Sequence, residues 1–133
     1  MPFVGLKAMK RASIHLFEKL DAQLGSIYQE ISALARKAPN DAVNAFKIGL
    51  VNSTLKQCNE LFGKDYLPFQ DFTEFPQDEL PTNSDVAFVV LQYKGCAEKL
   101  RADNIRLESF DEWVWKIDDK GEQIQTAPPK KLS

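Results

Sequence analysis

Residues 41–62 read DAVNAFKIGLVNSTLKQCNELF and carry two apolar rows at helical spacing. A surface helix of a small protein needs only one such row. The main row runs through Ile48, Val51, Leu55, Cys58 and Phe62. The second row, on another face, consists of Val43, Phe46 and Leu50. Because one row is enough to build a core, another part of the chain or a second copy of it must cover the other. We therefore take Val43, Phe46 and Leu50 as the candidate interface.

Two further segments show the three- and four-residue apolar spacing that is typical of a helix. The first spans residues 12–37 and ends before Pro39, because the residue before a proline disfavours helical geometry. Only about three residues then precede the segment 41–62, so the first two helices should form an antiparallel hairpin. The third helix is expected near residues 85–103, although the apolar run 86–91 also suits a buried strand.

Four aromatic residues lie in the long connection between the second and third helices, residues 64–83: Tyr66, Phe69, Phe72 and Phe75. So many aromatic side chains argue against disorder. They predict an ordered loop with at least two of the four packed on the helices. The same side chains would also suit a ligand pocket or a surface for a partner. The connection is acidic, and no lysine or arginine occurs between Lys64 and Lys94.

The spacing of apolar residues changes near the C-terminus, where Trp113, Trp115 and Ile117 occupy alternate positions. Residues 118–121 have turn composition, so a β-hairpin is predicted near residues 112–126. A lone hairpin is marginal in water. Trp113 and Trp115 should therefore contact the helices or another chain. Residues 127–133 contain two prolines and are expected to form a disordered tail.

Together these patterns predict one mainly α domain over residues 1–126. Its core should be a three-helix, bundle-like arrangement with a long antiparallel helical hairpin, an ordered aromatic loop and a small C-terminal β-hairpin. The chain of 133 residues is long enough to bury such a core without disulfides.

No motif for catalysis, for a cofactor or for a metal ion appears in the sequence. His15 is the single histidine and has no partner residue nearby, whereas a histidine-based metal site needs several ligands at local spacing. Cys58 and Cys96 fall on core rows, and we expect two buried, reduced thiols. We therefore assign no catalytic, cofactor-binding or metal-binding residue and do not expect an enzyme.

The overall charge and hydropathy argue against two classes of protein, nucleic-acid binders and membrane-spanning proteins. The net charge of −2 argues against a nucleic-acid binder. No apolar run is long enough to span a membrane, and a cytoplasmic location is the default expectation.

We interpret the chain as a non-enzymatic association protein that forms a homodimer by a two-fold contact and also binds a protein partner. Inhibitor, immunity, antitoxin-like and adaptor roles all fit this description. The alternative is a small-ligand-binding protein, with a pocket between the second and third helices under the aromatic loop.

Overall fold

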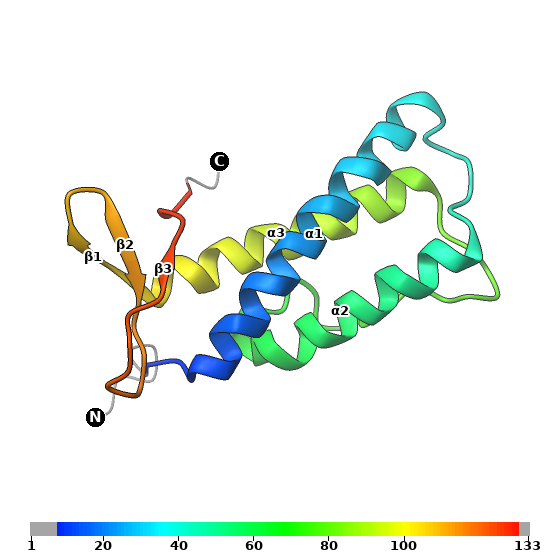
Figure 1. The fold of residues 1–133 in the computed structure, drawn as a ribbon. Coiled ribbons are helices and arrows are strands. Elements are labelled where there is room, and N and C mark those ends of the chain that lie inside the picture. Colours follow the sequence, from blue (N-terminus) through cyan, green and yellow to red (C-terminus); the bar gives the residue numbers. More distant parts are fainter. Residues whose placement is uncertain (1–7, 131–133) are drawn as a thin grey trace.

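Three helices form a bundle with a small sheet at one end, in a computed structural model that describes residues 8–130 (Figure 1). The helices are α1 (Arg11–Lys37), α2 (Ala45–Tyr66) and α3 (Asn83–Asp103). α1 runs antiparallel to α2 and α3, which run in the same direction as each other (Figure 1). The predicted fold class, mainly α with an antiparallel helical hairpin, is confirmed.

Each helix contributes one apolar row to a shared core. The buried residues of these rows are Ile14, Phe17, Leu20, Leu24 and Ile31 in α1, Ile48, Val51, Leu55, Cys58 and Phe62 in α2, and Val86, Val90, Tyr93, Ala97 and Leu100 in α3. The α2 row is the main row predicted from the sequence. Burial of such rows is the principal stabilising contribution in a bundle of this size.

α2 begins later than the sequence predicted, at Ala45 instead of near Asp41. Asn44 caps the helix, and its side chain accepts a hydrogen bond from the backbone N–H of Lys47 at 2.8 Å. Before this cap the chain is extended, and the N–H of Val43 donates to the carbonyl of Pro81. Val43 consequently lies in the core and not on the candidate interface, which is a correction to the predicted row.

The ends of the helices follow local sequence signals. Gly63 adopts φ = 64°, the left-handed conformation that favours glycine, and it interrupts α2 where the sequence suggested that the helix ends. α3 begins after Thr82, whose hydroxyl accepts a hydrogen bond from the N–H of Asp85. The apolar run 86–91 lies inside α3, so the strand alternative for this run is wrong.

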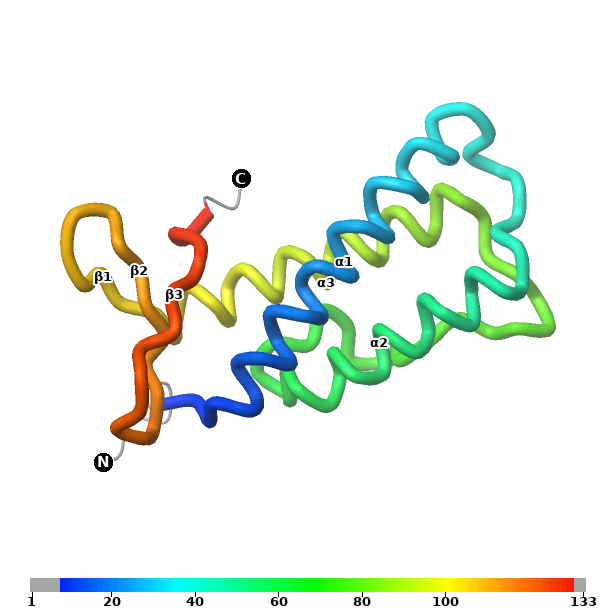
Figure 2. Tube along the Cα trace, viewed as in Figure 1, coloured from blue at the N-terminus to red at the C-terminus, as the bar shows by residue number. Residues whose placement is uncertain are grey.

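The aromatic loop, residues 67–82, runs back along α2 in the opposite direction to the helix (Figure 2). Asn59 on α2 donates to the carbonyl of Thr73. The side-chain amide of Asn52 bonds both the N–H and the carbonyl of Phe75. Phe75 is buried in the core, and Phe72 packs against it. The prediction of an ordered loop with at least two packed aromatics is confirmed.

The C-terminal part forms a three-stranded antiparallel sheet in the order β1 (Ile105–Ser109), β2 (Glu112–Trp115) and β3 (Gln125–Thr126). β2 and β3 are the predicted hairpin. The third strand, β1, was not predicted from the sequence, although Ile105 and Leu107 alternate with polar residues. The turn between β1 and β2 contains Asp111 at φ = 53°.

The sheet is attached to the helices through Trp115, which is fully buried. Its ring meets the ring of Phe17 on α1 edge to face, with centroids 5.1 Å apart. Beyond the sheet, residues 127–130 are exposed and lack regular secondary structure. The rest of the predicted tail, residues 131–133, lies outside the described residues.

Candidate functional site

Three surfaces present large apolar side chains to solvent, and the first is a groove between α1 and α2. Two adjoining hollows of about 150 and 310 Å³ form this α1–α2 groove and share Ser26, Ile27 and Leu50. Leu50 is 55% exposed, and Phe46, one turn earlier on α2, is 76% exposed. Two of the three predicted interface residues are therefore exposed one turn apart on α2, and of these Leu50 lines the groove.

The α1–α2 groove is neutral. Lys47 and Glu30 form an ion pair across it, with Nζ 2.7 Å from the carboxylate. Further along, the hydroxyl of Thr54 donates to the side-chain carbonyl of Gln23 at 3.1 Å. The second hollow is lined by no charged residue. The groove thus has apolar side chains, short polar ones and one internally balanced charge pair.

The second surface consists of four phenylalanine rings, each in contact with the next, that lead from α3 into the loop. Phe88 stacks on Phe69, Phe69 meets Phe72 edge to face, and Phe72 meets Phe75 in the same way. The centroid distances are 6.4, 6.1 and 5.0 Å. The chain of rings begins at an exposed side chain, Phe88, and ends in the core. Aromatic pairs in such geometries add to the stability of the loop.

An open groove of about 740 Å³ lies beside these rings, between the loop and the first turns of α3. We call it the loop–α3 groove. Phe75, Leu80, Pro81 and Phe88 contribute apolar walls, and Glu79 and Asp85 contribute carboxylates. Phe75 itself packs into the core beneath the loop, where the small-ligand alternative expected a pocket.

Tyr66 belongs to a different environment from the other three predicted loop aromatics. It is half-buried at the end of α2, and its hydroxyl donates to the carboxylate of Asp103 at 2.7 Å. Burial and the nearby Asp103 raise the pKa of Tyr66 to about 12. The predicted loop site therefore divides into Tyr66, which joins α2 to α3, and the phenylalanine rings beside the groove.

The third surface is the outer end of the sheet. Leu107 and Trp113 face each other across β1 and β2, and Phe110 at the turn is 97% exposed. Trp113 is half-buried and lines a shallow groove with Phe110 and Thr126. Of the two predicted hairpin contacts, Trp115 lies in the core, and Trp113 packs against the core while part of its side chain lines this groove.

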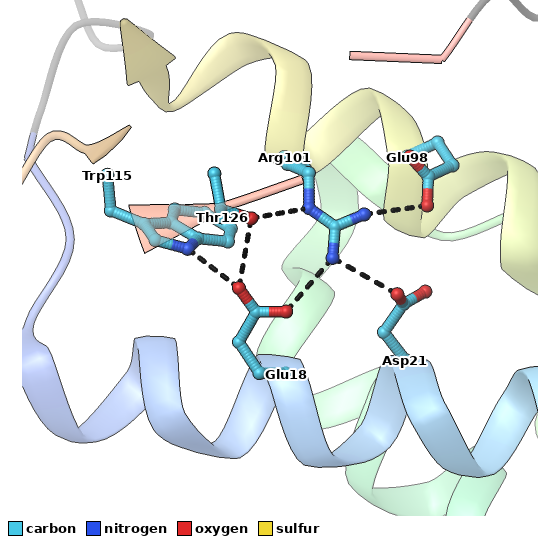
Figure 3. A network of polar contacts seen from close by, with 6 residues as sticks. All are labelled: Glu18, Asp21, Glu98, Arg101, Trp115 and Thr126. Carbon is cyan, nitrogen blue, oxygen red and sulfur yellow. Dashed lines mark hydrogen bonds and ion pairs between the residues drawn. The ribbon is translucent and has the colours of Figure 1, made fainter. Parts of the chain in front are cut away.

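A buried arginine lies at the junction of the helices and the sheet (Figure 3). Arg101 on α3 is 3% exposed and donates to three carboxylates, those of Glu98, Glu18 and Asp21, at 2.8, 3.0 and 3.1 Å. Its Nε also donates to the hydroxyl of Thr126 on β3 at 3.0 Å. One guanidinium therefore joins α1, α3 and the last strand.

Glu18 extends this network to β2. One of its carboxylate oxygens accepts hydrogen bonds from the indole N–H of Trp115 at 2.9 Å and the hydroxyl of Thr126 at 3.0 Å (Figure 3). The guanidinium of Arg101 also lies 5.2 Å from the centroid of the Phe17 ring, within cation–π range. The arrangement is suited to holding the sheet against the helices.

The network has more negative than positive groups. Burial alone would lower the pKa of Arg101, but the carboxylates of Asp21, Glu98 and Glu18 outweigh it and raise that pKa. One oxygen each of Asp21 and Glu98 is buried without a hydrogen-bond partner among the described residues. A buried polar atom without a partner is costly. Without Arg101, these carboxylates would lose their remaining buried partner as well, so the stability of this junction depends on Arg101.

This network was not predicted from the sequence, although the sequence contains a signal for it. Arg101 follows Ala97 by four residues and therefore falls on the buried face of α3. Glu98 precedes it by three residues, which places the two side chains on neighbouring positions of the helix. A charged residue on a core row indicates a buried partner.

The two cysteines are unpaired, as predicted, but they differ in burial. Cys58 is fully buried, whereas Cys96 is only half-buried, so the prediction of two buried thiols is wrong for Cys96. Burial, with a contribution from the Asp21 carboxylate, raises the pKa of Cys58 to about 12. Burial also raises the pKa of Cys96. Both groups are therefore neutral thiols at physiological pH and weak nucleophiles.

We expect Cys58 to resist thiol reagents until the protein unfolds. In a Cys96→Ser variant, the native protein should react far more slowly than the same variant in denaturant, because the reagent cannot reach a fully buried thiol. Unfolded Cys58 ionises near its ordinary pKa of 9.0, whereas the native thiol stays protonated. The contribution of Cys58 to the free energy of unfolding should therefore fall as pH rises from about 9 towards 12. Equal labelling rates for native and unfolded protein would contradict this assignment.

Other chemical features of residues 8–130 are few. No group of three or more histidine, cysteine, aspartate or glutamate side chains in this range is arranged to hold a metal ion. His15 is exposed on α1. Within the same range no helix is long and apolar enough to cross a bilayer. Comparisons of the chain with protein families, with curated proteins and with solved structures gave no significant match.

Proposed function

We propose that this protein is a non-enzymatic association protein that forms a homodimer through the α1–α2 groove. The observation that carries the proposal is the exposure of Phe46 and Leu50 one turn apart on α2, with Leu50 lining the groove beside Ile27 of α1. A row of large apolar side chains at the edge of a groove loses its contact with water when a second molecule covers it. Exposed apolar side chains that cluster in this way indicate an interaction surface, whereas single exposed apolar side chains are normal on a protein.

The charge of the groove supports self-association over binding to an unlike partner. In a two-fold contact the same patch meets itself, so an excess of either charge would repel. The ion pair of Lys47 with Glu30 balances the charges at one end of the groove, and the other end has only apolar and neutral polar side chains. The α1–α2 groove therefore suits a contact with its own copy.

The small-ligand alternative has weaker support. A site for a small molecule usually surrounds most of the ligand. The hollow beside the aromatic loop is an open groove, and Phe75 fills the space beneath the loop. We therefore rank an association role first and keep inhibitor, immunity, antitoxin-like and adaptor functions as its possible forms.

Light scattering at micromolar concentration tests the dimer. The chain mass is 15.1 kDa, so the native protein should give twice that value, about 30 kDa. A Phe46→Glu variant should shift the mass to that of a monomer, because the contact would bury a carboxylate without a partner on each side. Phe46 is largely exposed in the single chain, so this variant should still fold.

A matched control is Phe110→Glu, which places the same charge on an exposed phenylalanine at the turn between β1 and β2. This variant should retain the mass of the native protein. A native mass near 15.1 kDa at every concentration would refute the dimer. Equal loss of mass in both variants would show that the contact does not use the α1–α2 groove.

A further inference from the structure

The loop–α3 groove differs from the α1–α2 groove in charge. No lysine, arginine or histidine occurs between Lys64 and Lys94, whereas six acidic residues do: Asp65, Asp71, Glu74, Asp78, Glu79 and Asp85. Glu79 and Asp85 line the groove itself. Within residues 8–130 neither of them takes part in an ion pair. The groove therefore carries negative charge that this part of the chain does not neutralise.

The groove is held open by contacts at both of its ends. At one end, the side chain of Asn52 bonds both backbone polar groups of Phe75. At the other end, the carbonyl of Pro81 accepts a hydrogen bond from the N–H of Val43. Thr82 next to it forms an isolated antiparallel β-bridge with Ala42. A preformed site loses little conformational freedom when it binds a ligand, which favours affinity.

One wall of the groove is the ring of Phe88, which is held in place by other aromatic rings on the side away from the groove. Phe88 is 58% exposed, yet its ring stacks on Phe69, which in turn meets Phe72. Leu91 is also exposed on α3, three residues further along the same face. The free side of the Phe88 ring can accept an apolar side chain or a cation, and the carboxylate of Asp85 lies on the preceding turn.

We propose that the loop–α3 groove binds an extended segment of a partner protein in which basic side chains alternate with large apolar ones. The apolar side chains pack against Phe75, Leu80 and Phe88. The ammonium or guanidinium groups pair with Glu79 and Asp85. The proposal rests on the proposed function only in treating the chain as an association protein, since it uses a different surface from the dimer contact.

The acidity and the openness of the groove decide the kind of occupant. A second copy presenting the same groove would bring carboxylates against carboxylates, which is unfavourable. A small organic cation would leave much of its surface in solvent, because the groove is open along one side. A peptide segment can fill the groove and continue over the exposed Phe88 and Leu91, so it buries more apolar surface.

Fluorescence anisotropy with a short labelled peptide that alternates lysine with leucine and phenylalanine tests this proposal on the full chain. We expect saturable binding that weakens as salt is added, because salt screens exposed charges. Phe88→Ala should weaken binding by about tenfold. The double variant Glu79→Gln with Asp85→Asn should weaken it by a similar factor and remove most of the salt dependence. Unchanged affinity in both variants would overturn the proposal.

Control peptides separate this groove from general attraction of charge. Replacement of the apolar side chains by alanine, or of lysine by glutamate, should each weaken binding by at least about tenfold. The Phe46→Glu variant should bind the original peptide with unchanged affinity even if it alters the dimer, which distinguishes failure of one proposal from failure of the other. Equal binding of the alanine peptide, or equally tight binding of a small phenylalkylammonium ion, would overturn the assignment to a peptide segment.

Discussion

Replacement of Arg101 by methionine is expected to lower the free energy of unfolding by about 3–5 kcal/mol, the range for removal of one partner from a buried ion pair. Methionine has a similar length but no charge. It would leave Glu98, Glu18 and Asp21 without the guanidinium that now lies between them. Denaturant unfolding followed by circular dichroism measures the effect. Because Arg101 also bonds Thr126 on β3, the fluorescence of the nearby Trp115 should change as well.

Arg11 provides the matched control for this prediction. It also joins α1 to the C-terminal part, through an ion pair with Asp119 at 2.8 Å, but this pair is exposed. Exposed ion pairs contribute little to stability. Arg11→Met should therefore change the unfolding midpoint only slightly. Small and similar effects of the two substitutions would show that the buried network does not hold the sheet on the helices.

The second large effect is expected at the aromatic loop. Phe75→Ala should lower the free energy of unfolding by about 3–5 kcal/mol, as is typical when a buried phenylalanine is truncated. Phe75 is buried in the core and its backbone is fixed by Asn52, so the cavity cannot close without movement of the loop. Thermal or denaturant unfolding of the variant measures this loss.

Phe69→Ala is the control from the same loop. Phe69 is only half-buried and meets Phe72 and Phe88, so its truncation should destabilise the protein clearly less than that of Phe75. The sequence alone does not distinguish the two phenylalanines. If Phe75→Ala left stability unchanged, the loop would be detached from the core in solution, and the loop–α3 groove would lose its wall.

The candidate surfaces were only partly predictable. The excess of apolar residues on α2 indicated a second surface, and Phe46 and Leu50 do form one. The acidic, aromatic composition of the loop also marked a region of interest. The position of the loop–α3 groove did not follow from composition, because it depends on which ring enters the core. Here Asn52 on α2 bonds the backbone of Phe75, and this contact joins residues far apart in sequence.

The sequence by itself determined the three helices, with the start of α2 placed about four residues too early, and the β2–β3 hairpin. These features depend on interactions within a few residues: the spacing of apolar residues, the turn composition and the left-handed Gly63. Such interactions are local, so they are readable from the order of residues.

Only the tertiary structure decided which of these residues are covered and which charges are buried. Val43 lies in the core because the chain before α2 pairs with Pro81 and Thr82, whereas Phe46, three residues later, faces solvent. Arg101 is buried because Glu18 on α1 and Thr126 on β3 both reach it. Residues on different elements make these contacts, and the free energy of burying a side chain depends on what the rest of the chain brings against it.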